Sequence, residues 1–452
     1  MFAHTLTSGP GPLSLRNLLF MRIAIIAPGS RGDVQPYIAL GKGLKKAGNA
    51  VRLVTNRNYE MLANSHGLEF WPVEVNMQDI IQNERMRAVL EKGNLLASMS
   101  QMGKELKRGA LHLADRGLAA CRRLDMVLAG IGGLFVGLSL AGRLGLPFLQ
   151  AYNVPFTPTQ AFSGALLPKL PSWLGGSLNR LSHHLTRQIV WQAYRPADRL
   201  VRQKVLGLPI APFWGSFKSD RLHHGPILYG FSLSVILPPS DWDNNVTGYW
   251  FLDPPDDWNP PSALMEYLQA GSSPVYIGFG SMSNRKPEET TDLVFQALTR
   301  TKQRAIMLSG WSGLRKSDLP DSVFMVDSVP HSRFLPRVEA VIHHGGAGTT
   351  AAGLRAGVPS VIIPFHGDQP FWGQRIAELG VGPVPIPRRR LSVERLAQAI
   401  EEAVTDQTMR QHAADLGSKI RAEDGIAREI AVVQHIEKHV SRPAGEMGFY
   451  DV

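Results

Sequence analysis

The sequence of 452 residues is almost free of cysteine, because Cys121 stands alone. A lone cysteine excludes a disulfide within the chain and a metal framework built on paired cysteines. The composition therefore favours a reducing, cytoplasmic setting. Glycine (44) and proline (32) are scattered, and hydrophobic residues make up 44% of the chain. Low-complexity architectures are thereby excluded, and two or three globular domains with sizeable cores are expected.

Long apolar segments are also lacking. Residues 1–20 have neither a positively charged start nor a sustained apolar stretch, which argues against a signal peptide. They are interpreted as a disordered tail or a mis-called translation start, and residues 441–452 as a second tail. The uncharged residues 126–142 are short for a membrane span and are interrupted by glycines. A buried strand, a loop and a helix explain them better, so no transmembrane segment is predicted.

Acidic residues are outnumbered, since 48 Lys and Arg face 38 Asp and Glu, for a formal net charge of +10. The excess is concentrated in residues 82–123 and 169–223, and the second segment contains Trp173, Trp191 and Trp214. Basic helices with interleaved tryptophan suit peripheral association with an anionic membrane. An ordinary solvated basic face explains the same pattern, and both interpretations stay open. No nucleic-acid-binding motif accompanies the charge, so no nucleic acid partner is expected.

The N-terminal half alternates predicted strands and helices. Residues 22–28 predict a buried strand, Gly29–Asp33 a turn, and Pro36–Lys46 a helix that ends at Gly48. Further strands are predicted at residues 51–55, 69–73, 126–130 and 147–151. This order is typical of a Rossmann-like domain, here assigned to residues 21–237.

A second alternating series follows a proline- and aspartate-rich segment. Residues 238–262 predict an interdomain linker. Strands are then predicted at residues 274–279, 304–309, 323–326, 340–343 and 360–364, with a helix at 391–404. The C-terminal domain is assigned to residues 263–440. The fold class is therefore α/β, with two Rossmann-like domains facing each other across a cleft.

The most informative segment is VIHHGGAGTTAAGLRAGVPSVIIPFHGDQPFW, residues 341–372. It opens with a predicted strand, a glycine-rich turn and a helix N-terminus, whose unpaired N–H groups and dipole attract an anion. Glycine lets a diphosphate approach the backbone, since no Cβ intervenes. A second strand ends in the Gly367–Asp368–Gln369 loop at the carboxyl edge of the sheet. A phosphate cradle and polar groups for sugar hydroxyls are expected one βαβ unit apart.

This segment resembles the donor-binding signature of family-1 glycosyltransferases, in particular the sterol 3-beta-glucosyltransferase branch. GSRGDVQP at residues 29–36 is similar to the GxRGDVxP element of that branch, and PVYIGFGSM at 274–282 and VGPVPIP at 381–387 also match it. The resemblance covers residues 21–435 and is loosest in the N-terminal half. It implies the GT-B fold, with residues 21–237 as the acceptor-binding domain and 263–440 as the nucleotide-sugar-binding domain. It also implies UDP-glucose as donor, no metal or other cofactor, and inverting transfer to the hydroxyl of a sterol or sterol-like lipid.

Asp33 is the predicted general base. A carboxylate beside glycines in a cleft-facing turn can take the proton of an acceptor hydroxyl, and the resemblance assigns the matching aspartate this role. A helix-capping aspartate is the alternative meaning of the position. His343 is expected to be structural, packed under the glycine-rich turn.

The resemblance also supplies the donor-binding residues. It places His344 on the diphosphate, with Gly346, Gly348 and Thr349 forming the cradle. Ser281 would contact the diphosphate through its hydroxyl or N–H, although a purely structural turn explains it as well. Asp368 and Gln369 match the Asp-Gln pair that contacts the hydroxyls of glucose.

The base-binding side departs from the plant small-molecule members of the family. Residues 328–331, Ser-Val-Pro-His, fall where those members carry Trp-x-Pro-Gln and stack uracil on the tryptophan. Val329 and His331 are the candidate contacts there. Trp311 is the candidate replacement for the missing aromatic residue, and a core position is its alternative.

The acceptor side is less defined. Tyr152, Phe156 and Phe162 are candidates for lining a sterol-sized groove, and the same residues suit a core. Asp241–Trp242–Asp243 matches the short Asp-x-Asp pattern of metal-using glycosyltransferases, but it falls in the proline-rich linker, so no metal site is predicted.

Three other functions are weighed. The nearest is the same chemistry on a glycolipid, polyketide or glycopeptide aglycone. A UDP-sugar epimerase with the GT-B fold would need more acid and base groups around the sugar and no open acceptor groove. A lipid-binding protein without catalysis would not need both Asp33 and the donor residues.

Overall fold

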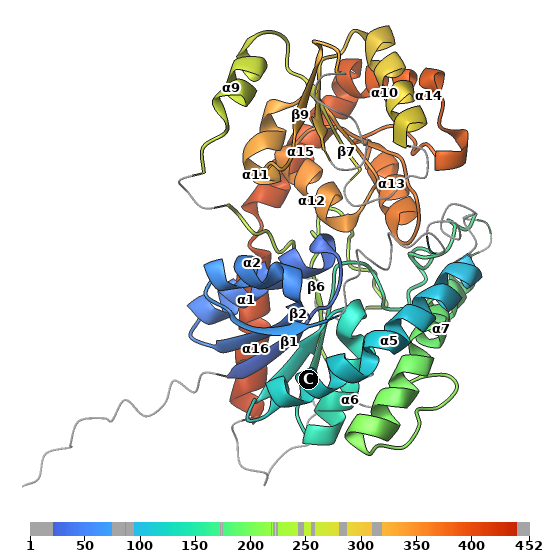
Figure 1. Cartoon of the computed structure of the whole chain (residues 1–452). Coiled ribbons are helices and arrows are strands. Elements are labelled where there is room, and N and C mark those ends of the chain that lie inside the picture. The colour runs from blue at the N-terminus through green and yellow to red at the C-terminus, as the bar shows by residue number, and fades with distance from the viewer. Residues whose placement is uncertain are drawn as a thin grey trace, which may run out of the picture.

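The chain is described by a computed structural model over residues 21–74, 86, 95–171, 173, 175–217, 219, 222, 225–242, 248–254, 258–279, 287–309 and 319–440. These residues form two α/β units stacked one above the other (Figure 1). Within them, the N-terminal sheet has the order β3-β2-β1-β4-β5-β6, and the C-terminal sheet has the order β11-β10-β7-β8-β9. Two predicted Rossmann-like halves are thereby confirmed.

The N-terminal sheet is parallel throughout and covered on both faces. Its strands are β1 (Arg22–Ile26), β2 (Ala50–Asn56), β3 (Glu69–Val73), β4 (Met126–Ala129), β5 (Phe148–Tyr152) and β6 (Ile227–Tyr229). Along β1, Ile23 and Ile25 join one core while Ala24 and Ile26 join the other. Two cores explain the unbroken apolar strands, because both sheet faces exclude water. The three-residue β6 was not predicted.

The helices of this unit are α1 (Arg31–Lys46), α2 (Glu60–Ser65), α5 (Leu95–Cys121), α6 (Leu134–Leu144) and α7 (Gly175–Val201), with short helical turns η1 (Arg57–Tyr59), η2 (Ile131–Gly133) and η4 (Arg202–Leu206). Helices α5 and α7 pack side by side (Figure 1). Gly103 permits this approach, since a Cβ there would lie 2.8 Å from the Ala193 carbonyl oxygen. The predicted reading of residues 126–142 as strand, loop and helix is confirmed by β4, η2 and α6.

The predicted start of the first helix is wrong. Proline is most favourable in a first helical turn, so Pro36 was expected there. Instead, α1 begins at Arg31 after the N-cap Ser30, and Pro36 lies inside the helix. The stronger signal is Ser30 followed three residues later by Asp33, which form a capping box.

The C-terminal unit follows the predicted series closely. Its strands are β7 (Val275–Gly278), β8 (Ala305–Leu308), β9 (Val323–Val326), β10 (Val341–His343) and β11 (Ser360–Ile362). Its helices are α9 (Ser262–Gln269), α10 (Pro287–Thr301), α11 (His331–Phe334), α12 (Ala347–Ala356), α13 (Gln369–Glu378), α14 (Val393–Thr405) and α15 (Gln407–Ala422), with turns η6 (Leu335–Arg337) and η7 (Arg388–Arg390). The domain boundaries themselves stay a prediction.

The helix α16 (Gly425–Val440) returns to the N-terminal unit and packs beside α1 (Figure 1). Gly43 of α1 makes room for it, because a Cβ there would lie 2.2 Å from Cγ2 of Ile426. Buried Glu429 accepts a hydrogen bond from Nε1 of Trp250 at 3.2 Å. These contacts fasten the C-terminal helix α16 to the N-terminal unit.

Candidate active site

A cleft of about 1450 Å³ lies between the two units and is lined by both. The N-terminal unit contributes residues that follow β1, β4 and β5 together with parts of α5 and α7. The C-terminal unit contributes the loop after β9, the first turn of α12 and the loop after β11. The volume exceeds the range of about 300–1,000 Å³ typical of single small-molecule sites. The cleft therefore has space for two substrates side by side.

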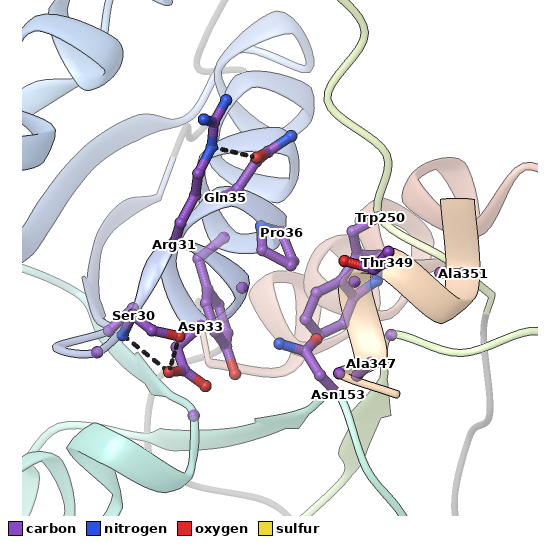
Figure 2. A pocket seen from close by; sticks show the side chains of 18 of the residues that line it. Ser30, Arg31, Asp33, Gln35, Pro36, Asn153, Trp250, Ala347, Thr349 and Ala351 are labelled. Carbon is purple, nitrogen blue, oxygen red and sulfur yellow. Dashed lines mark hydrogen bonds between the residues drawn. The ribbon is translucent and has the colours of Figure 1, made fainter. Parts of the chain in front are cut away.

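Asp33 lies in the first turn of α1 and faces this cleft (Figure 2). The backbone N–H and the hydroxyl of Ser30 both donate to its Oδ2 at 2.8 Å. The capping role considered from the sequence is therefore real, and Oδ1 takes part in neither bond. Gly29 is required beside it, since a Cβ there would lie 2.4 Å from Cβ of Asp33.

The carboxyl group of Asp33 is open to the cleft but surrounded by protein. Loss of bulk water raises its pKa above the ordinary value, and the hydrogen bonds from Ser30 partly offset that rise. A raised pKa makes the ionised carboxylate a stronger base.

The glycine-rich turn after β10 forms the expected helix N-terminus. Gly346 is the N-cap of α12, and Ala347, Gly348 and Thr349 occupy its first turn. These first-turn N–H groups have no partner within a helix and are oriented along its dipole. All four residues line the cleft. The arrangement has the geometry that suits an anion.

Glycine is required twice in this turn for different reasons. Gly345 has a φ of +85°, and a Cβ there would lie 2.7 Å from Cγ2 of Ile362. Gly346 has an ordinary φ of −63°. A Cβ on Gly346 would lie 2.5 Å from Nε2 of His344. Gly345 thus permits the turn, whereas Gly346 leaves space for the imidazole beside the cradle.

His343 and His344 separate into different roles. His343 is fully buried, and its Nδ1 accepts the N–H of Gly345 at 3.1 Å, which confirms the structural position predicted for it. His344 lines the cleft. Burial lowers the pKa of His344 to about 4, and the nearby His366 and His331 further disfavour its protonation. The imidazole of His344 is therefore neutral at pH 7.

Asp368 and Gln369 open α13 from the loop after β11. Oδ2 of Asp368 accepts the indole N–H of Trp372 at 2.8 Å. Oε1 of Gln369 accepts the backbone N–H groups of Phe365 and His366 at 2.7 and 3.0 Å. Gln369 thus orders the loop that carries Asp368, and both residues line the cleft.

The two units bring their acidic groups into one electrostatic environment. Burial raises the pKa of Asp368 to about 6, and the negative charge of Asp33 adds to that rise. Helices α1 and α12 approach each other at their N-termini, where a Cβ on Gly348 would lie 4.0 Å from Cα of Gly32. Residues more than 300 positions apart in the sequence therefore share the cleft.

The base-binding candidates are only partly placed. Val329 and His331 line the cleft, and Tyr276 Oη lies 3.3 Å from Nε2 of His331. Burial lowers the pKa of His331 to about 4, with a smaller contribution from the charge of Arg31. Ser281 and Trp311 lie outside the described residues.

The predicted acceptor residues do not all line the cleft. Phe156 does. Tyr152 is fully buried, donates its hydroxyl to Oε1 of Gln150 at 2.9 Å and is not among the lining residues. Phe162 packs against Trp242 and Phe371 rather than among the lining residues. The pattern of apolar residues in the sequence does not tell which of them line a groove and which pack in the core beneath it.

Sequence reasoning missed several lining residues. His366 lines the cleft, and its buried Nε2 has no hydrogen-bond partner among the described residues. Arg31 also lines the cleft, and its Nε donates to Oε1 of Gln35 at 3.2 Å (Figure 2). Asn153 and Trp250 reach the same pocket (Figure 2). His366 directly precedes the Gly367–Asp368–Gln369 loop, which was an available signal.

Asp241 has a local structural role. Its Oδ1 accepts the Thr159 hydroxyl at 2.7 Å, and its Oδ2 accepts the Gln160 N–H at 2.9 Å. Asp243 lies outside the described residues. Among the residues that are described, no group of three or more His, Cys, Asp or Glu side chains is arranged to hold a metal ion.

Comparison with known families places the two halves in glycosyltransferases. The glycosyltransferase family 28 N-terminal domain matches residues 23–163. The C-terminal domain of the erythromycin biosynthesis protein CIII-like family matches residues 293–436. A sterol 3-beta-glucosyltransferase of Arabidopsis thaliana is 34% identical over 95% of this chain and 69% of the plant protein. A sterol 3-beta-glucosyltransferase of Cryptococcus neoformans is 35% identical over 91% of this chain. The matched part makes up only 27% of that fungal protein.

Solved structures show the same fold. The calicheamicin glycosyltransferase CalG4 aligns with a TM-score of 0.66 at 17% identity, covering 94% of this chain and 100% of that one. The glycosyltransferase VinC, solved in complex with DTDP, aligns with a TM-score of 0.65 at 17% identity, covering 93% and 100%. These neighbours and the two parallel sheets confirm the predicted GT-B fold.

Proposed function

Because the chain belongs to the family of the sterol 3-beta-glucosyltransferases, we propose that it transfers glucose from UDP-glucose to the hydroxyl of a sterol or sterol-like lipid, with inversion at the anomeric carbon. The observation that carries the proposal is the shared cleft. Asp33 from one unit faces Asp368 and the α12 cradle from the other. An acceptor base and a donor site thus meet where the two substrates fit together.

The donor diphosphate is assigned to the first turn of α12. The N–H groups of that turn and the helix dipole stabilise the charge that develops as the bond to the sugar breaks. His344 beside the turn donates a hydrogen bond from its neutral imidazole. The ionised carboxylate of Asp368 accepts hydrogen bonds from sugar hydroxyls, while Gln369 holds the loop in place.

Asp33 is assigned the role of general base for the acceptor hydroxyl. Its carboxylate removes the hydroxyl proton as the acceptor oxygen attacks the anomeric carbon from the face opposite UDP. The new C–O bond forms, the bond from the sugar to UDP breaks, and the negative charge leaves with UDP. No additional base is needed, and the proton ends on Asp33.

The acceptor side of the cleft is largely apolar, which supports a lipid acceptor. Its lining includes Leu106, Leu113, Val136, Phe156, Leu166, Val190 and Tyr194. A sterol in the cell resides in a bilayer, so the proposal includes a cytoplasmic protein that associates peripherally with an anionic membrane. None of the helices among the described residues is long and apolar enough to cross a bilayer.

The proposal is tested by measuring UDP release from UDP-glucose, with and without a detergent-dispersed sterol. Sterol-dependent release, with a sterol glucoside of inverted configuration as product, is the expected result. UDP-glucose binding without a sterol response would overturn the acceptor assignment and direct the search to glycolipid or natural-product acceptors. Failure to bind UDP-glucose at all would overturn the donor assignment.

The affinity for UDP-glucose is predicted to fall in mild acid. If the ionised form of Asp368 binds the sugar, the complex holds fewer protons than the free protein, so acid weakens binding. With the pKa of Asp368 at about 6, affinity at roughly pH 5 should be about tenfold weaker than at roughly pH 7.5. Calorimetry across this range measures the effect. Asp368→Asn should bind UDP-glucose more weakly, and its affinity should no longer fall between these pH values. A fall in affinity that persists in this variant would contradict the assignment.

The indole of Trp372 is predicted to set the pH at which the affinity for UDP-glucose falls. Its N–H stabilises the ionised form of Asp368 and so opposes the rise in its pKa. Trp372→Phe removes the donor while keeping an aromatic side chain. The same calorimetric titration should show the midpoint displaced to higher pH, and an unchanged midpoint would show that the indole has no influence on the carboxyl group.

A further inference from the structure

The outer side of α7 carries large apolar side chains that face solvent. Trp173 before the helix is 80% exposed, and Leu181 and Leu185 are 59% and 50% exposed. Leu178 is also exposed, and its spacing places it on the same helical face. Apolar side chains gathered on one face indicate an interaction site, whereas single exposed ones do not.

A neighbouring loop extends this apolar area. Phe213 and Trp214 are 52% and 68% exposed. The Phe213 carbonyl accepts hydrogen bonds from the side chains of Trp191 and Gln192 on α7 at 2.8 and 3.0 Å, and the Arg195 guanidinium lies 4.9 Å from the Phe213 ring centroid. The loop is therefore fastened along the helix. We name the α7 surface by its members: Trp173, Leu178, Leu181, Leu185, Phe213 and Trp214.

The tryptophans of the basic segment are now distinguished. Trp173 and Trp214 are exposed, whereas Trp191 is fully buried against Phe135. Trp191 therefore cannot contribute to a membrane-facing surface, whereas Trp173 and Trp214 can. Only tertiary packing separates them.

The segment that carries the α7 surface is strongly basic, although acidic groups of other segments lie near two of its cations: Lys169 pairs with Glu378, and Asp241 lies near Arg180. Residues 169–217 contain seven Lys and Arg but only one acidic residue, Asp198. Asp198 is buried and accepts hydrogen bonds from Arg202 and Ser139. Arg180, Arg199 and Lys204 are exposed. A second copy of this surface would therefore meet like charge, whereas an anionic lipid headgroup layer complements it.

The opposite side of α7 forms a wall of the cleft. Thr186, Val190, Tyr194 and Ala197 line it. The cleft and the α7 surface are thus separated by a single helix, about 10–12 Å across with its side chains. Helix α7 lies along the outside of the N-terminal unit (Figure 1). A layer in contact with this surface lies next to the apolar half of the cleft.

We propose that the α7 surface docks onto an anionic lipid bilayer, with its tryptophans and leucines entering the headgroup region and its arginines and lysines contacting lipid phosphates. Docking places the acceptor side of the cleft at the membrane and gives a sterol a short path into it. This role in acceptor delivery rests on the proposed function, whereas the binding to lipid does not. Interfacial helices with an apolar face and a basic polar face bind in this way.

The test measures co-sedimentation with vesicles of phosphatidylcholine containing about 30 mol% phosphatidylserine, without any substrate. Wild-type protein should bind these vesicles, and pure phosphatidylcholine more weakly. The double variant Leu181→Gln/Leu185→Gln should bind about tenfold more weakly, because two apolar side chains no longer enter the lipid. The matched control is Met61→Gln/Val384→Gln, two side chains that are 86% and 75% exposed elsewhere. It should bind like the wild type.

Activity separates the two proposals. The double variant should keep its turnover on detergent-dispersed sterol and lose most of it on sterol embedded in the same vesicles. Wild-type protein that turns over dispersed sterol but fails to bind vesicles would overturn the docking proposal alone. Vesicle binding without any glucosyl transfer would overturn the proposed function alone. A double variant that binds vesicles as the wild type does would overturn docking through the α7 surface. If that variant also changes the oligomeric state, the surface would be assigned to a contact between protein chains.

Discussion

Replacing Asp33 by asparagine is expected to reduce kcat about a thousandfold, within the range of about 10²–10⁴ for a general base. Asparagine keeps the shape of the side chain, and its amide oxygen can still accept the N–H of Ser30, so α1 keeps its cap. What disappears is the ability to take a proton. Because the proposed diphosphate and sugar contacts come from the other unit, the affinity for UDP-glucose should remain close to that of the wild type.

Steady-state kinetics and calorimetry on the same preparation check this result. Asp253→Asn is the matched control, since this carboxylate also lines the cleft but pairs with Arg355 at 2.7 Å. An exposed ion pair of this kind contributes little, so kcat should change about twofold or less. A fall in kcat below tenfold for Asp33→Asn would contradict the assignment. So would a parallel loss of UDP-glucose binding, because Asp33 would then act on the donor.

Gly346→Ala is expected to weaken UDP binding about a hundredfold, an effect of about 2.7 kcal/mol. The φ of −63° suits alanine, so the backbone itself is not strained. The new Cβ would instead lie 2.5 Å from Nε2 of His344 and displace the imidazole. The added methyl group would also stand where the diphosphate approaches the first turn of α12. Both effects fall on the donor, so melting temperature should change little.

A double-mutant cycle identifies how much of this loss passes through His344. Calorimetry with UDP is performed on Gly346→Ala, His344→Ala and the combined variant. If the clash with the imidazole dominates, the second change adds little, and the coupling energy is large. Strictly additive losses would show that the methyl group acts on the diphosphate alone. Gly142→Ala, where an added Cβ meets nothing within 4 Å, should leave binding unchanged.

Much of the fold was predictable because its signals are local. Continuous apolar runs mark strands covered on both faces, and nearly all the strands of both sheets were placed within a few residues. The three-residue β6 was missed because so short a run has no period to detect. The start of α1 was misplaced because the predicted helix was begun at Pro36. The capping box of Ser30 and Asp33, which marks the true start, was not used.

The candidate site was predictable where a motif carries backbone chemistry. The glycine-rich turn and the helix after it follow directly from the residues, and the resemblance added roles for Asp33, His344 and Asp368. The acceptor wall was not predictable at the same level. Tyr152 is buried and Phe156 lines the cleft, although they lie in one apolar segment. His366 was overlooked because a histidine in a loop has no distinctive local signal.

By itself, the sequence determined the two β/α halves, the glycine-rich helix N-terminus and the family, because these depend on residue order, spacing and glycine at particular positions. Only the tertiary structure decided which side chains share the cleft and which faces meet solvent. The pKa of Asp368 depends on burial and on Asp33 in the other unit. The exposure of Trp173 and the burial of Trp191 depend on how α7 packs. Such properties arise from contacts between distant residues, and no local pattern contains them.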